Sequence, residues 1–91
     1  MVAEPPEERC FKISKKAHKF ITSLPEKERR TIKRAVSRLI ASDDISSLDI
    51  KRLAPHPNEF RLRVGKIRIL FRAGKDMLFI FKAGFRGDVY K

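Results

Sequence analysis

The last third of the chain has arginines at alternating positions, and together they could bind phosphate. Arg61 and Arg63 alternate with apolar residues, and Arg68 and Arg72 follow a few positions later. A period of two is typical of strands, so each pair should share one face of a strand. Pairing of adjacent strands would place cross-strand residues about 5 Å apart on one face. Cations this close repel unless an anion lies among them, which predicts a phosphate site.

The same alternation has a plainer interpretation. When one face of a sheet is buried, the other meets solvent, and arginines are common there because their apolar stems cover the sheet. The distribution of charge does not decide between the two. The net charge is +11, and residues 51–91 hold 11 Lys and Arg against 3 Asp and Glu. Such a field attracts nucleic acid, anionic membranes or an acidic protein.

Several chemistries lack their residues in this sequence. There is no glycine-rich phosphate loop and no His/Cys spacing of a metal site, and the C-terminal carboxylates are too few and dispersed for a two-metal nuclease. His18 and His56 are interpreted as surface histidines, with His56 kept as a minor candidate because it precedes the arginine strands. We therefore expect neither a metal nor a small-molecule cofactor.

Cleavage of RNA needs neither of these, because RNA carries its own nucleophile. To attack the adjacent phosphate, the 2′-hydroxyl must be oriented and must lose its proton to an acceptor. The negative charge of the pentavalent intermediate must be stabilised by positive groups beside it. Clustered guanidinium groups supply the charge, and tight binding supplies the orientation. DNA has no 2′-hydroxyl, so this route is specific to RNA.

The elements that must position the arginines follow from the pattern. Residues 10–13 alternate as a short strand, and Ser14 is a helix N-cap candidate. Two amphipathic helices follow, separated by Pro25. Their apolar stripes consist of Ala17, Phe20, Ile21 and Leu24, and of Ile32, Ala35, Val36, Leu39 and Ile40.

Three strands are predicted after the helices, at residues 60–64, 67–72 and 77–81, whereas residues 48–53 are too few to classify. We predict an α+β fold: an N-terminal strand, then an antiparallel helical hairpin packed on a mostly antiparallel sheet of about four strands. Residues 1–9 are expected to be a flexible leader, and residues 10–91 a single domain.

A cytoplasmic protein is expected. Cys10 is the only cysteine, so no internal disulfide is possible, which fits a reducing compartment. No apolar run approaches the roughly 18 to 20 residues of a membrane span. The acidic, proline-bearing N-terminus is unlike a signal peptide.

Two blocks of the sequence carry a family resemblance. Residues 60–71, FRLRVGKIRILF, resemble the YRLRVGDYRVIY block of the RelE/ParE toxin superfamily, and residues 84–91, GFRGDVYK, resemble its GHRRDVYR ending. The resemblance implies a RelE-like fold and the toxin of a type II toxin–antitoxin module. RelE-like members are metal-independent endoribonucleases that cut mRNA in the ribosomal A site and leave a 2′,3′-cyclic phosphate. A cognate antitoxin holds them inactive.

The resemblance also implies roles for residues. Arg61 and Arg68 would hold the scissile phosphate, and Arg86 would stabilise the transition state or protonate the leaving 5′-oxygen. Tyr90 would stack on or orient the nucleotide. The predicted catalytic residues are Arg63, Arg68, Arg86 and Tyr90. The predicted RNA-binding residues are Lys51, Arg52, Arg61 and Lys66.

The chain departs from the family pattern at the general base. The RelE branch often has lysine where this chain has Arg63, and arginine is a poor proton acceptor because it stays protonated. Tyr90 is a plausible substitute, with Lys51 and Lys66 weaker ones. Val89 replaces the histidine that some branches place before the tyrosine. Two alternatives remain open: a ParE-type toxin that binds DNA gyrase without cutting nucleic acid, and a non-catalytic nucleic-acid-binding module.

Overall fold

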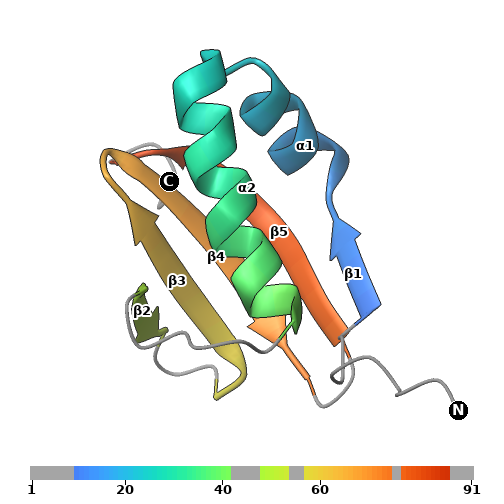
Figure 1. Cartoon of the computed structure of the whole chain (residues 1–91). Helices are drawn as coiled ribbons and strands as arrows, with labels where there is room; N and C mark the ends of the chain where they lie inside the picture. Colours follow the sequence, from blue (N-terminus) through green and yellow to red (C-terminus); the bar gives the residue numbers. More distant parts are fainter. Residues whose placement is uncertain (1–9, 42–47, 54–56, 75–76, 87–91) are drawn as a thin grey trace, which may run out of the picture.

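Two helices cover one face of a mixed sheet (Figure 1). The computed structural model describes residues 10–41, 48–53, 57–74 and 77–86, and within them the chain forms two helices and five strands. These elements are β1 (Cys10–Ile13), α1 (Lys15–Thr22), α2 (Glu26–Ala41), β2 (Asp49–Arg52), β3 (Glu59–Val64), β4 (Ile67–Ala73) and β5 (Met77–Phe85). Neither described helix has the length and hydropathy that a membrane span needs.

Ser14 starts α1 and also fastens it to the sheet. Its Oγ accepts a hydrogen bond from the Ala17 backbone N at 3.1 Å, which satisfies one of the free N–H groups of the first turn. The same hydroxyl donates to the Phe81 carbonyl at 3.2 Å, and the Ser14 backbone N donates to the Ile80 carbonyl at 2.9 Å. The predicted N-cap is confirmed, and it holds the entry of the helix against β5.

The apolar stripe of α2 forms the core with one face of the sheet. Ile32, Ala35, Val36 and Leu39 are buried, as their i, i+3, i+4, i+7 spacing predicts. Alternate residues of the central strands meet them from the sheet side. These are Leu62, Ile69, Phe71, Leu78 and Ile80, each at most 2% exposed.

The strand order is β1-β5-β4-β3-β2, with β1 parallel to β5 and every other pair antiparallel. The α+β class and the N-terminal strand are confirmed. The fifth strand, β2, is the difference from the sequence-based prediction. It has only four residues and lies at an edge of the sheet, so its pattern is too short to identify without its partner β3.

Strand β5 extends four residues beyond the predicted end at Phe81. A register shift explains the difference: Leu70 pairs with Lys82 and Phe71 pairs with Ile80, so Phe81 is an extra residue in β5. Such a bulge interrupts the period of two from which a strand is recognised. Beyond it, Phe85 returns to the helix side, where its ring meets that of Phe20 at a centroid distance of 5.1 Å.

Replacing Ile32 with alanine should lower the free energy of unfolding by about 2–5 kcal/mol, because it leaves a cavity between α2 and the sheet. Ile32 is 1% exposed. The neighbouring Lys33 is exposed, so Lys33→Ala is the matched control and should change stability by no more than about 0.5 kcal/mol. Urea unfolding followed by circular dichroism measures both. Equal losses would contradict this account of the core.

Candidate nucleic-acid interface

The face of the sheet that the helices leave uncovered carries the charged side chains. Because paired residues point to the same side, the register arranges this open face in three rows. The row nearest the β3–β4 turn consists of Asp49, Arg63, Arg68 and Gly84. The middle row consists of Lys51, Arg61, Leu70 and Lys82. The third row consists of Glu59, Arg72, Phe79 and Lys12.

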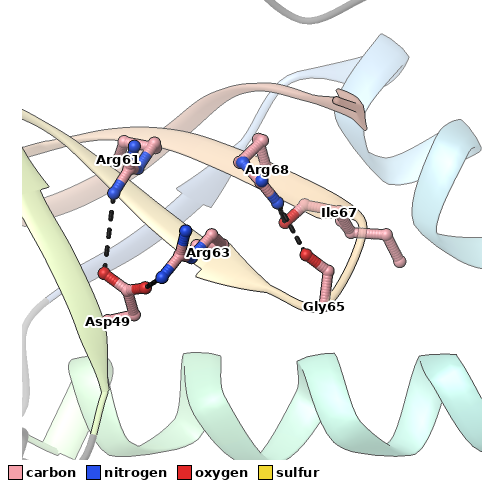
Figure 2. A network of polar contacts seen from close by, with 6 residues as sticks. All are labelled: Asp49, Arg61, Arg63, Gly65, Ile67 and Arg68. Atoms are coloured by element: carbon pink, nitrogen blue, oxygen red, sulfur yellow. Dashed lines mark hydrogen bonds and ion pairs between the residues drawn. The ribbon is translucent and has the colours of Figure 1, made fainter. Parts of the chain in front are cut away.

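Asp49 joins the two arginines of β3 (Figure 2). Its Oδ1 lies 3.5 Å from Nη2 of Arg61, and its Oδ2 forms a close ion pair with Nη2 of Arg63. Sequence analysis missed this carboxylate because it lies in the strand that could not be classified. The one available signal was that Asp49 and Lys51 alternate with the apolar Leu48 and Ile50.

Arg61 is the more enclosed of these two arginines. Its side chain is 19% exposed, compared with 51% for Arg63. The Nε atom of Arg61 is buried and has no hydrogen-bond partner within the described part of the chain. A buried donor without a partner is costly, so this guanidinium is poised to accept a further anionic ligand.

Arg68 is held differently, by main-chain oxygens of the turn that it follows (Figure 2). Its Nη1 donates to the carbonyl of Gly65 at 2.7 Å and to that of Ile67 at 3.2 Å. The residue is only 7% exposed, and it takes part in none of the ion pairs formed among the described residues. The turn itself depends on Gly65, whose φ of +59° is rarely adopted by other residues. Arg68 therefore stabilises this end of the sheet.

Arg86 and Lys66 meet at the same end of the sheet. The backbone N of Arg86 donates to the carbonyl of Lys66 at 2.9 Å, which anchors the chain after β5 to the β3–β4 turn. Both residues are exposed, so their charged groups are available to a ligand.

Aromatic rings lie at the opposite end of the open face. Phe79 and Phe81 have centroids 6.3 Å apart, and the Arg72 guanidinium lies 5.1 Å above the Phe81 ring. Nε of Arg72 also donates to Glu59 at 2.8 Å. Rings beside cations suit single-stranded nucleic acid, whose bases stack on aromatic faces while its phosphates pair with cations.

The structure brings together six of the eight residues that the sequence predicted. Four of the six lie in the two rows nearest the β3–β4 turn: Lys51, Arg61, Arg63 and Arg68. The other two, Lys66 and Arg86, meet at the turn itself. Arg52 is not among them: it pairs with Phe60, whose ring stacks on the buried Phe71, so it points to the helix side of the sheet. Tyr90 lies outside the described residues, and its role stays a prediction.

No family model and no curated protein sequence match the chain. Solved structures do. The RelB–RelE antitoxin–toxin complex from Methanococcus jannaschii matches with a TM-score of 0.73 and 25% identity over 87% of this chain and 94% of that one. The archaeal RelE–RelB complex from Pyrococcus horikoshii OT3 matches with a TM-score of 0.74 and 22% identity over 88% and 97%.

The isolated E. coli RelE toxin is a further match, with a TM-score of 0.70 and 18% identity over 90% of both chains. The chain therefore has the fold of the RelE-like toxins. This confirms the resemblance to the superfamily that the two sequence blocks predicted.

Replacing Arg68 with alanine should lower the free energy of unfolding by about 1.5–3 kcal/mol, the usual loss for hydrogen bonds made by a charged group. Arg63→Ala removes the same side chain from the paired position, where it is half exposed, and should cost less than about 1 kcal/mol. Urea unfolding at neutral pH compares the two. A loss at position 63 as large as that at position 68 would show that the turn does not depend on Arg68.

Proposed function

We propose that this chain is the toxin of a type II toxin–antitoxin module and that it cleaves mRNA on the ribosome. The observation that carries the proposal is the arginine cluster on the open sheet face of a RelE-like fold, with Arg86 anchored at its border. Solved structures with the same fold are RelE toxins, and two of them are complexes with RelB.

The cleavage that suits this face is attack by the RNA's own 2′-hydroxyl. The 2′-oxygen forms a bond to phosphorus while the bond to the 5′-oxygen breaks, which leaves a 2′,3′-cyclic phosphate and a 5′-hydroxyl. Arg61 and Arg63 would bind the phosphate oxygens and stabilise the extra negative charge of the transition state. The resemblance gave Arg68 this phosphate contact in place of Arg63, but the Arg68 guanidinium donates to the carbonyls of Gly65 and Ile67. Arg86 would stabilise the charge that develops on the leaving 5′-oxygen, which takes its proton from water to become the 5′-hydroxyl. The guanidinium groups supply the positive charge that this route requires, so it needs no metal ion.

Proton transfer is the step for which this face offers few groups. Arginine stays protonated and cannot accept the proton of the 2′-hydroxyl. Tyr90 remains the proposed proton acceptor, as a substitute for the lysine that Arg63 replaces, and the family resemblance also implies that it orients the nucleotide. Lys51, on the open face beside Arg61, and Lys66, in the turn, are the alternatives within the described residues. The ribosome supplies positioning that the isolated chain lacks, which accounts for the proposed requirement for it.

Replacing Arg86 with alanine should reduce mRNA cleavage by about 10²- to 10³-fold, the usual effect of removing one charge-stabilising donor. The anchor to Lys66 uses the backbone N, so the variant keeps it. Cleavage mapped in a purified translation system, with growth arrest measured in parallel, is the test, and Tyr90→Ala should behave similarly. Lys27→Ala, which removes an exposed charge from α2, is the control and should leave cleavage unchanged.

Cuts positioned at the A site support the proposal. If the Arg86 and Tyr90 variants both cleave and arrest growth as the parent chain does, the assignment of catalytic residues is wrong. Intact mRNA together with inhibited DNA supercoiling would instead identify a ParE-type toxin that binds gyrase.

We also propose an acidic, amphipathic antitoxin segment as the partner. An open groove of about 700 Å³ lies between the helices and β1. Its apolar lining includes Phe11, Ile21 and Val36, and Phe11 is 41% exposed. Arg29 and Lys33 also line this groove. A helix or strand with apolar residues flanked by Asp and Glu would match both properties.

Replacing Phe11 with serine should weaken binding of the antitoxin about tenfold, since it removes an apolar side chain worth about 1.4 kcal/mol from the contact. Lys12→Ser is the matched control, because adjacent residues of β1 point to opposite sides of the sheet. Isothermal titration of the purified pair measures both affinities. Equal affinities for the Phe11 variant and the parent chain would place the antitoxin elsewhere.

A further inference from the structure

Asp49 contacts both arginines that the proposed function assigns to the phosphate. One carboxylate oxygen faces Arg61 and the other faces Arg63. Among the described residues, no other carboxylate forms an ion pair with either arginine. Two oxygens on one planar centre, each paired with a different guanidinium, resemble the way in which two phosphate oxygens would be bound. The carboxylate therefore lies where the ligand is expected.

The charges around Asp49 give it a role in the unbound protein. Arg63 pairs across strands with Arg68, and Arg61 lies in the next row, so three arginines lie on the same part of one face. Asp49 and Arg63 also line an open groove of about 740 Å³ between α2 and the edge of the sheet. Among the described residues, the other charged ones that line this groove are all basic: Arg30, Lys33, Arg34 and Arg38. One negative charge at this point lowers the repulsion among many positive ones.

Exposure distinguishes Asp49 from Arg61, the more enclosed of the two arginines that it contacts. Its side chain is 39% exposed, so it can turn into solvent without leaving a buried charge. The side chain of Arg61 is 19% exposed and is confined by its surroundings. An arriving phosphate can therefore replace the carboxylate while Arg61 remains in place.

We propose that Asp49 is an internal competitor for the RNA phosphate and a positioning residue for Arg61 and Arg63. Before RNA binds, it holds the two guanidinium groups at a spacing that suits an anion. The scissile phosphate then displaces it. The inference rests on the proposed function, because it takes the phosphate of RNA as the ligand. Removing the charge of Asp49 should then strengthen RNA binding, because the phosphate no longer has a competitor. It should also weaken catalysis, because the two guanidinium groups are no longer held at the required spacing.

Asp49→Asn tests the competition directly. A single-stranded 2′-O-methyl RNA binds without being cleaved, so its affinity is measured apart from catalysis. The variant should bind it about fivefold more tightly at low salt, the effect of one unit charge at about 4 Å in water. The dependence of log K on log salt concentration should steepen by up to about 0.7, because one more phosphate contact releases its counterion.

Glu26→Gln is the matched control for net charge. Glu26 also pairs with an arginine, Arg30, but on α2 and not on the open face of the sheet. The control adds the same unit of positive charge and breaks the same kind of ion pair, and it should change the affinity less than twofold. In an Arg63→Gln background, Asp49→Asn should lose most of its effect, because the competitor acts through the arginine.

Kinetics test the positioning role. With cleavable RNA on the ribosome, Asp49→Asn should lower kcat about tenfold or more while lowering KM, whereas a merely structural residue would not improve binding. Circular dichroism confirms that the variants are folded. Affinity that is unchanged or weaker in Asp49→Asn, or an equal gain in Glu26→Gln, overturns the competition. An unchanged kcat overturns the positioning role.

The affinity measurements also separate this inference from the proposed function. They use an RNA that cannot be cut, so tighter binding by Asp49→Asn stands even if the parent chain fails to cleave mRNA. If the parent chain cleaves mRNA and Asp49→Asn binds RNA no more tightly, the inference alone fails.

Discussion

The pleat of the sheet governs on which side each charged residue of the strands lies. The helices bury one face, so alternate residues of the strands must be apolar, and the residues between them must point the other way. In β3 and β4, arginines occupy the open face: Arg61 and Arg63 lie on either side of Leu62 in the sequence, and Arg68 precedes Ile69. The same alternation of apolar and charged residues therefore buries the core on one face and concentrates positive charge on the other.

Close guanidinium groups must be compensated, and this fold does so in three ways. A carboxylate from the neighbouring strand pairs with Arg61 and Arg63. Main-chain carbonyls of a turn accept from Arg68. Glu59 and an aromatic ring hold Arg72. These differ in how easily a ligand can replace them, because an exposed carboxylate can move away from its partners whereas the carbonyls of a turn cannot. The arginines of β3 are thus the adaptable part of the face.

Sequence periodicity predicted the elements that bury a continuous apolar stripe. The two helices, their separation at Pro25 and the face that carries the arginines all follow from spacing. Periodicity could not reveal what depends on pairing. Strand β2 has too few residues to show a pattern, so the contact between Asp49 and the arginines could not be predicted. It also could not show that Arg68 turns towards Gly65, because alternation gives the side of a strand and not the direction of a side chain.

The parallel pairing of β1 with β5 has a consequence for how the molecule is made. Residues 10–13 find their sheet partner only at residues 77–80, and Ser14 is fastened to Ile80 and Phe81. Contacts of such long sequence separation form slowly, because a large loop must close first. On a growing chain, the first strand and its helix have no sheet to join until β5 has emerged. Docking of β1 and α1 therefore waits for β5, whereas the strands that carry Arg61, Arg63 and Arg68 pair with near neighbours in the sequence.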